Sequence, residues 1–77
     1  MEPWRQAYYN RIGKNLLRFR KEQGLSQQEL SNKCNVDRAK ISRIENGRED
    51  FMMSTLLELC SALNRPLEDL ILEEPSN

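Results

Sequence analysis

The sequence predicts a single all-α domain of five helices, and two observations support this prediction. Apolar residues recur at helical spacing through most of the 77 residues, and residues typical of helix starts and ends separate the runs. No segment shows the strict alternation of a β-strand, an internal repeat or low-complexity composition. A chain of this length has room for one domain, over residues 1–77, with a small core.

The first helix is predicted to be long and to end at Gly24. Pro3 suits its first turn, because proline is favoured there, and glycine commonly follows a last turn. One apolar stripe recurs at steps of three and four residues and consists of Trp4, Tyr8, Ile12, Leu16 and Phe19. The sequence leaves open whether Trp4 and Tyr8 complete the core or enlarge an interface.

The second helix is predicted to start at a capping box formed by Ser26 and Glu29. In such a box the hydroxyl accepts from the third helical N–H and the carboxylate reaches back to the cap N–H. Leu30 and Cys34, four residues apart, give this helix its buried side. Asn35 is expected at the turn that follows, because asparagine tolerates the left-handed backbone conformation better than most residues.

A third helix follows almost at once, over about residues 38–46. Asp37 is its expected cap, Ile41 and Ile44 face inward, and Gly47 ends it. Two helices joined by so short a turn form a helix-turn-helix unit, in which the second helix protrudes. At 100° per residue, Ala39 and Arg43 lie on the side away from the inward Ile41, with Lys40 and Ser42 on its flanks, and Arg38 sits at the amino-terminal tip. A solvated face of a small bundle remains the alternative interpretation.

Two more helices are expected after residue 47. Ser54 is the expected cap of the segment TLLELCSAL, and Pro66 starts a last short helix through Leu67, Leu70 and Ile71. The tail, residues 73–77, is expected to fray.

Charge is divided along the chain although its net charge is zero. Residues 1–48 hold eleven Lys and Arg against five Asp and Glu, a net charge of +6, whereas residues 49–77 carry −6. This asymmetry suggests one half that faces a polyanion and one that faces elsewhere. A lopsided surface without a nucleic-acid partner is the alternative, since many soluble proteins have one.

The composition argues against several classes of protein. There is no histidine, and Cys34 and Cys60 are the only cysteines, so neither a zinc site nor a disulfide framework is available. Both are expected to be buried thiols. No recognisable catalytic set is present, so we expect neither an enzyme nor a metal or cofactor. No apolar run approaches the roughly 20 residues that span a bilayer, and the start lacks a signal peptide, so a cytoplasmic protein is expected.

The stretch LRFRKEQGLSQQELSNKCNVDRAKISRIENG, followed by STLLELCSALNRPLEDLI, resembles the phage-repressor-like helix-turn-helix family. That family includes phage repressors, xenobiotic-response-element-type regulators and restriction-modification controller proteins, and the match covers about residues 10–72. The resemblance implies a five-helix, lambda-repressor-like domain that binds a (pseudo)palindromic operator as a homodimer and regulates transcription, without a small-molecule ligand. Ser31 and Asn35 depart from the family pattern, where alanine and glycine are common.

The resemblance also assigns roles to individual residues. Base-reading residues are expected to be Arg38, Ala39, Arg43 and, at the border with the backbone, Ser42. Phosphate contacts are expected from Gln27 and Asn46, and by charge from Lys40 and Arg48. A structural ion pair is expected between Arg20 and Glu45. The chemistry agrees, because arginine presents a fork that matches the two major-groove acceptors of guanine, and alanine permits close approach.

A twofold dimer is expected because one recognition helix covers only a few base pairs. The acidic carboxyl-terminal half is the expected interface, and it offers Leu63, Arg65, Leu67, Leu70 and Ile71. The alternative is that Leu67, Leu70 and Ile71 only close the monomer core.

The alternative function is a protein-interaction module of the same fold, antitoxin-like or an adaptor, with little DNA binding. Gln27, Arg38, Arg43 and Asn46, gathered on one surface, argue against it.

Overall fold

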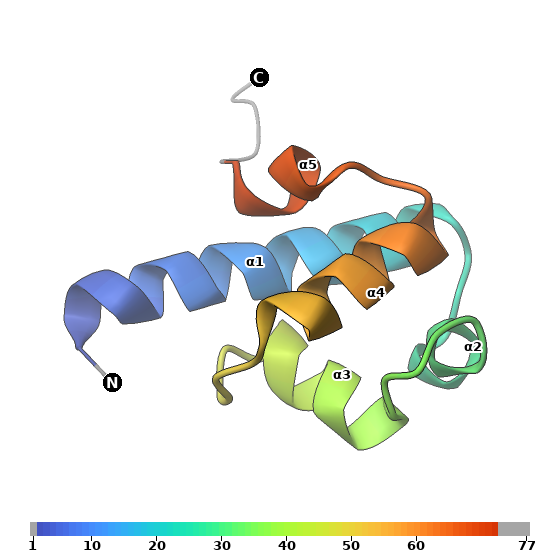
Figure 1. The fold of residues 1–77 in the computed structure, drawn as a ribbon, viewed down its shortest axis with the longest axis horizontal. Helices are drawn as coiled ribbons and strands as arrows, with labels where there is room; N and C mark the ends of the chain where they lie inside the picture. The colour runs from blue at the N-terminus through green and yellow to red at the C-terminus, as the bar shows by residue number, and fades with distance from the viewer. Residues whose placement is uncertain (1, 73–77) are drawn as a thin grey trace.

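The computed structural model describes residues 2–72, and within them it contains five helices and no strand (Figure 1). The helices are α1 (Pro3–Glu22), α2 (Gln27–Asn32), α3 (Arg38–Glu45), α4 (Met53–Leu63) and α5 (Leu67–Ile71). In Figure 1, α1 runs through the middle, with α2 and α3 on one side, α5 on the other and α4 in front. This arrangement confirms the predicted all-α, five-helix fold. The tail predicted to fray lies outside the described residues.

The stripe predicted for α1 is buried only in its second half. Leu16 and Phe19 are 0% and 4% exposed, whereas Trp4 and Tyr8 are 66% and 54% exposed. The difference arises because the first turns of α1 project beyond the other helices (Figure 1). Trp4 and Tyr8 therefore do not complete the core of the monomer. None of the helices in residues 2–72 has the length and apolar character needed to cross a membrane.

The predicted caps of α2 and α3 are confirmed. The Ser26 hydroxyl accepts from the Glu29 N–H at 3.0 Å, and the Ser26 N–H donates to the Glu29 carboxylate at 2.9 Å. These bonds hold the pKa of the Glu29 carboxyl below its usual value. The Asp37 carboxylate accepts from the Lys40 N–H at 2.8 Å. The starts of α2 and α3 are thus both set by local hydrogen bonds.

That turn differs from the prediction in its backbone. Asn35 does not adopt a left-handed conformation, and among residues 2–72 the one non-glycine residue with positive φ is Asn64. The turn is closed instead by a bond from the Cys34 N–H to the Ser31 carbonyl, at 3.2 Å. The Ser31 hydroxyl also donates to the Val36 carbonyl at 2.8 Å. Serine at a position where alanine is common therefore bridges the turn.

The start of α4 also corrects the prediction. Met52 is its N-cap, without a side-chain bond, and its carbonyl already accepts from the Thr55 and Leu56 N–H groups. Ser54 therefore lies inside the first turn and does not cap the helix. Asn64 ends the helix with φ 55° and ψ 45°, the left-handed conformation that asparagine tolerates.

The last helix closes the core over α1. Asn15, only 2% exposed, donates to the carbonyls of Leu70 and Leu72, each at 2.8 Å, and so satisfies the end of α5. Of the two cysteines, Cys60 is buried, which raises the pKa of its thiol, but Cys34 is only half-buried. The buried apolar core consists of Leu16, Phe19, Leu30, Val36, Ile41, Ile44, Leu56, Leu59, Cys60, Leu63 and Leu70.

Candidate nucleic-acid interface

The position of α3 is set by a close contact with α1 at Gly13. A Cβ at residue 13 would lie 2.4 Å from the Ile44 carbonyl oxygen and 2.8 Å from that of Glu45, so only glycine permits this approach. Ile41 and Ile44 are both 0% exposed and fix the rotation of α3 about its axis. The opposite side of α3 must therefore face solvent.

That open side carries the residues predicted to read bases. Arg38, Ala39 and Arg43 are exposed, and Ser42 is half-buried beside them. Arg38 lies at the first turn of α3 and forms no ion pair with any residue from 2 to 72. The structure thus brings all four residues to one protruding helix.

The carboxyl-terminal end of α3 is bound to α1 and α2 through the carboxylate of Glu45. Arg20 donates to both of its oxygens, from Nε at 2.7 Å and from Nη2 at 3.0 Å, and its Nη1 donates to the Leu25 carbonyl at 2.9 Å. Gln27 adds a third bond to Glu45 at 2.9 Å. The two charged side chains are only 10% and 4% exposed, so the pair expected from the sequence is nearly removed from water. This network fixes the last turn of α3.

The predicted phosphate contacts border the open side of α3. Gln27 donates one amide N–H to the Glu45 carboxylate, and Asn46 donates one amide N–H to the Ser42 carbonyl at 2.8 Å. Each amide keeps a second N–H that is available to a ligand. Arg48 is exposed just after the helix.

Glu49 is a contact of α3 that the sequence analysis did not identify. One of its carboxylate oxygens lies 3.0 Å from Arg43 Nε, and the other lies 3.7 Å from Lys40 Nζ. Gly47, with φ 66°, turns the chain so that Glu49 returns against the helix. An acidic residue shortly after a helix-ending glycine was the only signal in the sequence. In this structure the base-reading candidate Arg43 is thus paired with Glu49 through Nε, one of its three guanidinium nitrogens.

The loop after α3 is also held by the first turns of α1, which the sequence analysis missed. Gln6 donates to the Gly47 carbonyl at 2.8 Å, and the Tyr9 hydroxyl donates to the Asp50 carboxylate. The rings of Tyr9 and Phe51 meet edge to face, with centroids 5.2 Å apart. The shared hydrogen bond raises the pKa of Tyr9 and lowers that of Asp50. We call these five residues the brace.

The residues predicted for the dimer interface lie in different environments. Leu63 and Leu70 are 1% and 0% exposed, so they belong to the monomer core and have no surface to offer a partner. Leu67 is half-buried against the same core. Arg65 is engaged within the chain, with ion pairs to α1 at 3.6 Å and within its own segment at 3.2 Å. Only Ile71, 39% exposed, presents an apolar side chain to solvent.

The fold and the site together define a class of protein. Two helices joined by a short turn, the second protruding with cations on its open side, form a helix-turn-helix domain. Family comparison agrees, since the model described as helix-turn-helix, HTH_3, matches residues 16–70.

Relatives of known sequence and structure lie in the same class. The chain is 36% identical over 52 residues to the uncharacterised HTH-type transcriptional regulator y4dJ of Sinorhizobium fredii, which covers 68% of each chain. It is similar to the crystal structure of a hypothetical transcription factor, NHTF, from Neisseria, with a TM-score of 0.81 and 29% identity over 86% of this chain and 76% of that one. It is also similar to the restriction-modification controller protein C.AhdI of Aeromonas hydrophila, with a TM-score of 0.79 and 28% identity over 83% and 97%. The chain belongs to the HTH_3 family of helix-turn-helix transcriptional regulators.

Proposed function

We propose that this chain is a sequence-specific DNA-binding transcriptional regulator that places α3 in the major groove of its operator. The observation that carries the proposal is the open side of α3, where Arg38, Ala39 and Arg43 are exposed while Ile41 and Ile44 are fully buried. An α-helix fits the major groove, and an arginine fork matches the O6 and N7 acceptors of guanine. Alanine between two arginines lets the helix approach the bases closely.

The residues around this side position the helix on the backbone. Gln27, Lys40, Asn46 and Arg48 are the proposed phosphate contacts, with Ser42 at the border between base and backbone. Phosphate contacts fix the register of a protein on the duplex, whereas base contacts choose the sequence. The two sets of residues should therefore respond differently to substitution.

We further propose that the chain acts as a homodimer on a (pseudo)palindromic operator. One recognition helix contacts only a few base pairs, and helix-turn-helix dimers read two half-sites about 34–36 Å apart. A twofold protein then matches a twofold site.

Selection of bound duplexes from a random pool, followed by titration of variants, tests this function. Arg38→Ala and Arg43→Ala should each cost about 1–3 kcal/mol on the selected operator and relax the preference at one position of each half-site. Gln27→Ala should weaken binding to all sequences alike. Lys14→Ala, at an exposed lysine of α1 outside the site, is the matched control.

Equal losses on selected and random DNA for both arginine variants would show that these side chains contact phosphates and do not read bases. If the pool yields no preferred sequence and binding does not weaken with salt, the protein-interaction module becomes the better description.

A further inference from the structure

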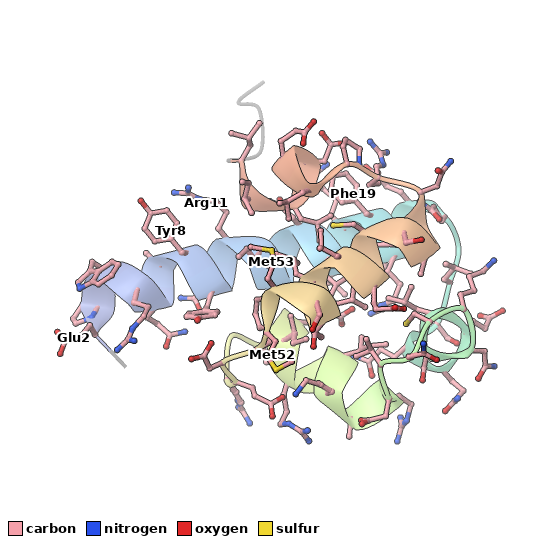
Figure 2. All side chains as sticks on the ribbon, in the orientation of Figure 1. Glu2, Tyr8, Arg11, Phe19, Met52 and Met53 are labelled. Carbon is pink, nitrogen blue, oxygen red and sulfur yellow. The ribbon has the colours of Figure 1, made fainter. Side chains whose placement is uncertain are left out.

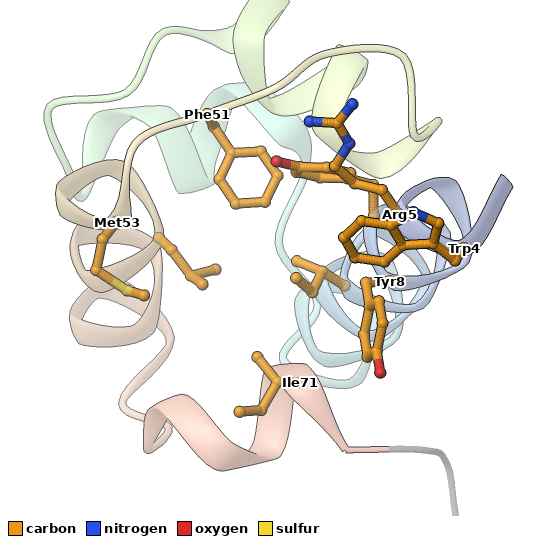
Figure 3. A pocket seen from close by; sticks show the side chains of 9 residues that line it. Trp4, Arg5, Tyr8, Phe51, Met53 and Ile71 are labelled. Carbon is orange, nitrogen blue, oxygen red and sulfur yellow. The ribbon is translucent and has the colours of Figure 1, made fainter. Parts of the chain in front are cut away.

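An apolar hollow of about 320 Å³ lies between α1, the loop after α3, α4 and α5 (Figure 3). Trp4 and Tyr8 line it from α1, Phe51 from the loop, Met53 from α4 and Ile71 from α5. Apart from the side chain of Arg5 and polar groups on the two tyrosine rings, its lining is apolar. Side chains of the monomer alone leave this hollow open to solvent.

The rim of the hollow is unusually exposed for residues of this type. Trp4, Tyr8 and Met53 are 66%, 54% and 59% exposed, and Ile71 is 39% exposed. Figure 2 shows Tyr8 projecting from α1 on the side away from α3. Single exposed apolar residues are ordinary on a protein surface, but several gathered around one concave site indicate a contact surface.

We propose that this hollow and its rim form the face through which two copies of the chain pair. The inference rests on the homodimer in the proposed function and moves its interface from the last helix to the junction of α1, α4 and α5. Leu63 and Leu70, predicted from the sequence for that interface, are buried in the core, whereas Ile71 joins the hollow.

The shape of this face fits a second copy of the same chain. A twofold contact uses the same patch on both subunits, so the patch must be complementary to itself. Here the projecting rings of Trp4 and Tyr8 stand beside the hollow, so the rings of each copy can fill the hollow of the other. An aromatic side chain buries roughly 150–250 Å². Since Trp4 and Tyr8 are 66% and 54% exposed in the monomer, the two rings of each copy can bury roughly 180–300 Å² more, about a quarter to a third of the roughly 800 Å² that each partner buries in a specific interface.

Charge and position also favour a second copy. Arg5 lies at the α1 edge of the hollow, whereas α5, at the opposite edge, carries the acidic side chain of Glu68, and its other acidic residue, Asp69, already pairs with Arg65. A twofold arrangement that crosses the two edges sets the basic edge of one copy against the acidic edge of the other. None of the residues proposed to contact DNA lines the hollow, so pairing and DNA binding do not compete for the same surface.

Pairing at this face would also contact the brace. Tyr9 and Phe51 line the hollow, and both belong to the group that holds the loop after α3. A partner seated here therefore packs against the segment that fixes the end of the recognition helix. Dimer formation and the placement of α3 share these side chains.

Sedimentation of charge-introducing variants tests the inference, both free and on a symmetric duplex. Tyr8→Glu and Met53→Glu place a carboxylate in the hollow, at exposed positions where the fold of the monomer does not require the original side chain. Each should weaken dimerisation about tenfold or more while the far-UV circular dichroism stays helical. Leu57→Glu is the matched control, since Leu57 is an exposed α4 residue, 48% accessible, outside the hollow, and this variant should pair like wild type.

Trp4 is the only tryptophan of the chain and reports on the hollow without any substitution. Its emission should shift to shorter wavelength as wild-type concentration rises through the dimerisation range, and the shift should be absent in Tyr8→Glu. Wild type that stays monomeric both free and on DNA would overturn the inference. So would a dimer whose Trp4 emission does not change, or Tyr8→Glu and Met53→Glu variants that pair as tightly as Leu57→Glu.

The failure of this inference is distinguishable from the failure of the proposed function. A chain that selects a DNA sequence but pairs normally in the hollow variants retains the proposed function and loses this interface. A chain that pairs through the hollow but selects no sequence retains the interface and loses the proposed function.

Discussion

The carboxylate of Glu45 should be the most sensitive charged group in the domain. It accepts bonds at 2.7 and 3.0 Å from Arg20 and at 2.9 Å from Gln27, and its side chain is only 4% exposed. It also lies at the end of α3, where a negative charge is unfavourable to the helix dipole unless a cation balances it. Glu45→Gln removes that charge and one of the two acceptor oxygens, so the guanidinium of Arg20 keeps only neutral acceptors, the new amide oxygen and the Leu25 carbonyl.

The expected cost is about 3–5 kcal/mol, the range found when one partner of a buried pair is removed. A domain of 77 residues has a total stability of roughly 4–12 kcal/mol, so this substitution should remove about a quarter or more of it. Urea unfolding followed by circular dichroism measures the loss. Glu22→Gln is the control, because Glu22 pairs with Arg65 at 3.6 Å but is 49% exposed, and such a pair contributes about 0–1 kcal/mol.

Two outcomes would refute this reasoning. Glu45→Gln that costs no more than Glu22→Gln would show that water compensates the guanidinium and that the pair is not effectively buried. The double replacement Arg20→Met with Glu45→Leu should recover much of the loss, since apolar side chains of similar volume replace a buried pair at little cost. Failure to recover would locate the cost in packing of α3 and not in the unpaired charge.

The other predictions concern the contacts around α3. Gly13→Ala should destabilise by about 1–2 kcal/mol in urea unfolding, because the new Cβ meets the Ile44 carbonyl while the gain in helix propensity is smaller; a stabilised variant would disprove the contact. The hydrogen bond from Tyr9 lowers the pKa of Asp50 in the folded chain, so this carboxylate stabilises the fold above pH 3.8, its usual pKa, and the stabilisation is lost as the pH falls further. Tyr9→Phe should therefore flatten the fall of the melting temperature at acid pH, and an unchanged slope would contradict this. Glu49→Gln frees the two cations of α3 that it contacts, so binding to random DNA should tighten and its salt slope should steepen, whereas unchanged affinity would show that the contact has no effect in solution.

Features set by neighbouring residues could be predicted from the sequence. The Ser26 and Glu29 box and the Asp37 cap each involve groups three residues apart, and the structure contains both. The positions of Ile41 and Ile44 follow from helical period, and both are fully buried. Local periodicity and capping chemistry therefore sufficed for the helix-turn-helix unit and for the orientation of its open side.

Features set by distant contacts could not be predicted. The apolar stripe of α1 has the same spacing throughout, but Trp4 and Tyr8 stay exposed because no helix packs over them. The start of α4 depends on the path of the loop before it, so the sequence predicted Ser54 as the cap although it lies inside the first turn. Left-handed backbone occurs at Asn64 and not at Asn35, because hydrogen bonds of Ser31 close the first turn without it. An asparagine in the sequence indicates that a left-handed conformation is tolerated at that position, but not that the backbone adopts it.

Within the candidate site, the contacts of Glu49 and of the brace could not be predicted from the sequence for the same reason. Their contacting partners lie six to forty-two positions apart in the chain, and a pattern in one segment carries no information about its partner. The amphipathic period of α1 predicted one buried face, but two different faces of this helix contribute to the proposed sites. Gln6, Tyr9 and Gly13 contact α3 and its loop, while Trp4 and Tyr8 turn toward the hollow.

This division of α1 explains why a helix that contributes none of the proposed DNA contacts should control how DNA is read. The proposed recognition helix, α3, has only two turns, and its first turn carries the proposed base contacts Arg38 and Ala39, so its orientation depends on its last turn and the loop after it. Both are held from α1, by the close approach at Gly13, by the ion pair of Arg20 and by the bond from Gln6. A base contact loses its geometry when the helix that carries it shifts by a fraction of a hydrogen-bond length. Substitutions on this face of α1 should therefore lower affinity for the selected operator more than affinity for random DNA, because phosphate contacts tolerate displacement better than paired contacts to base edges.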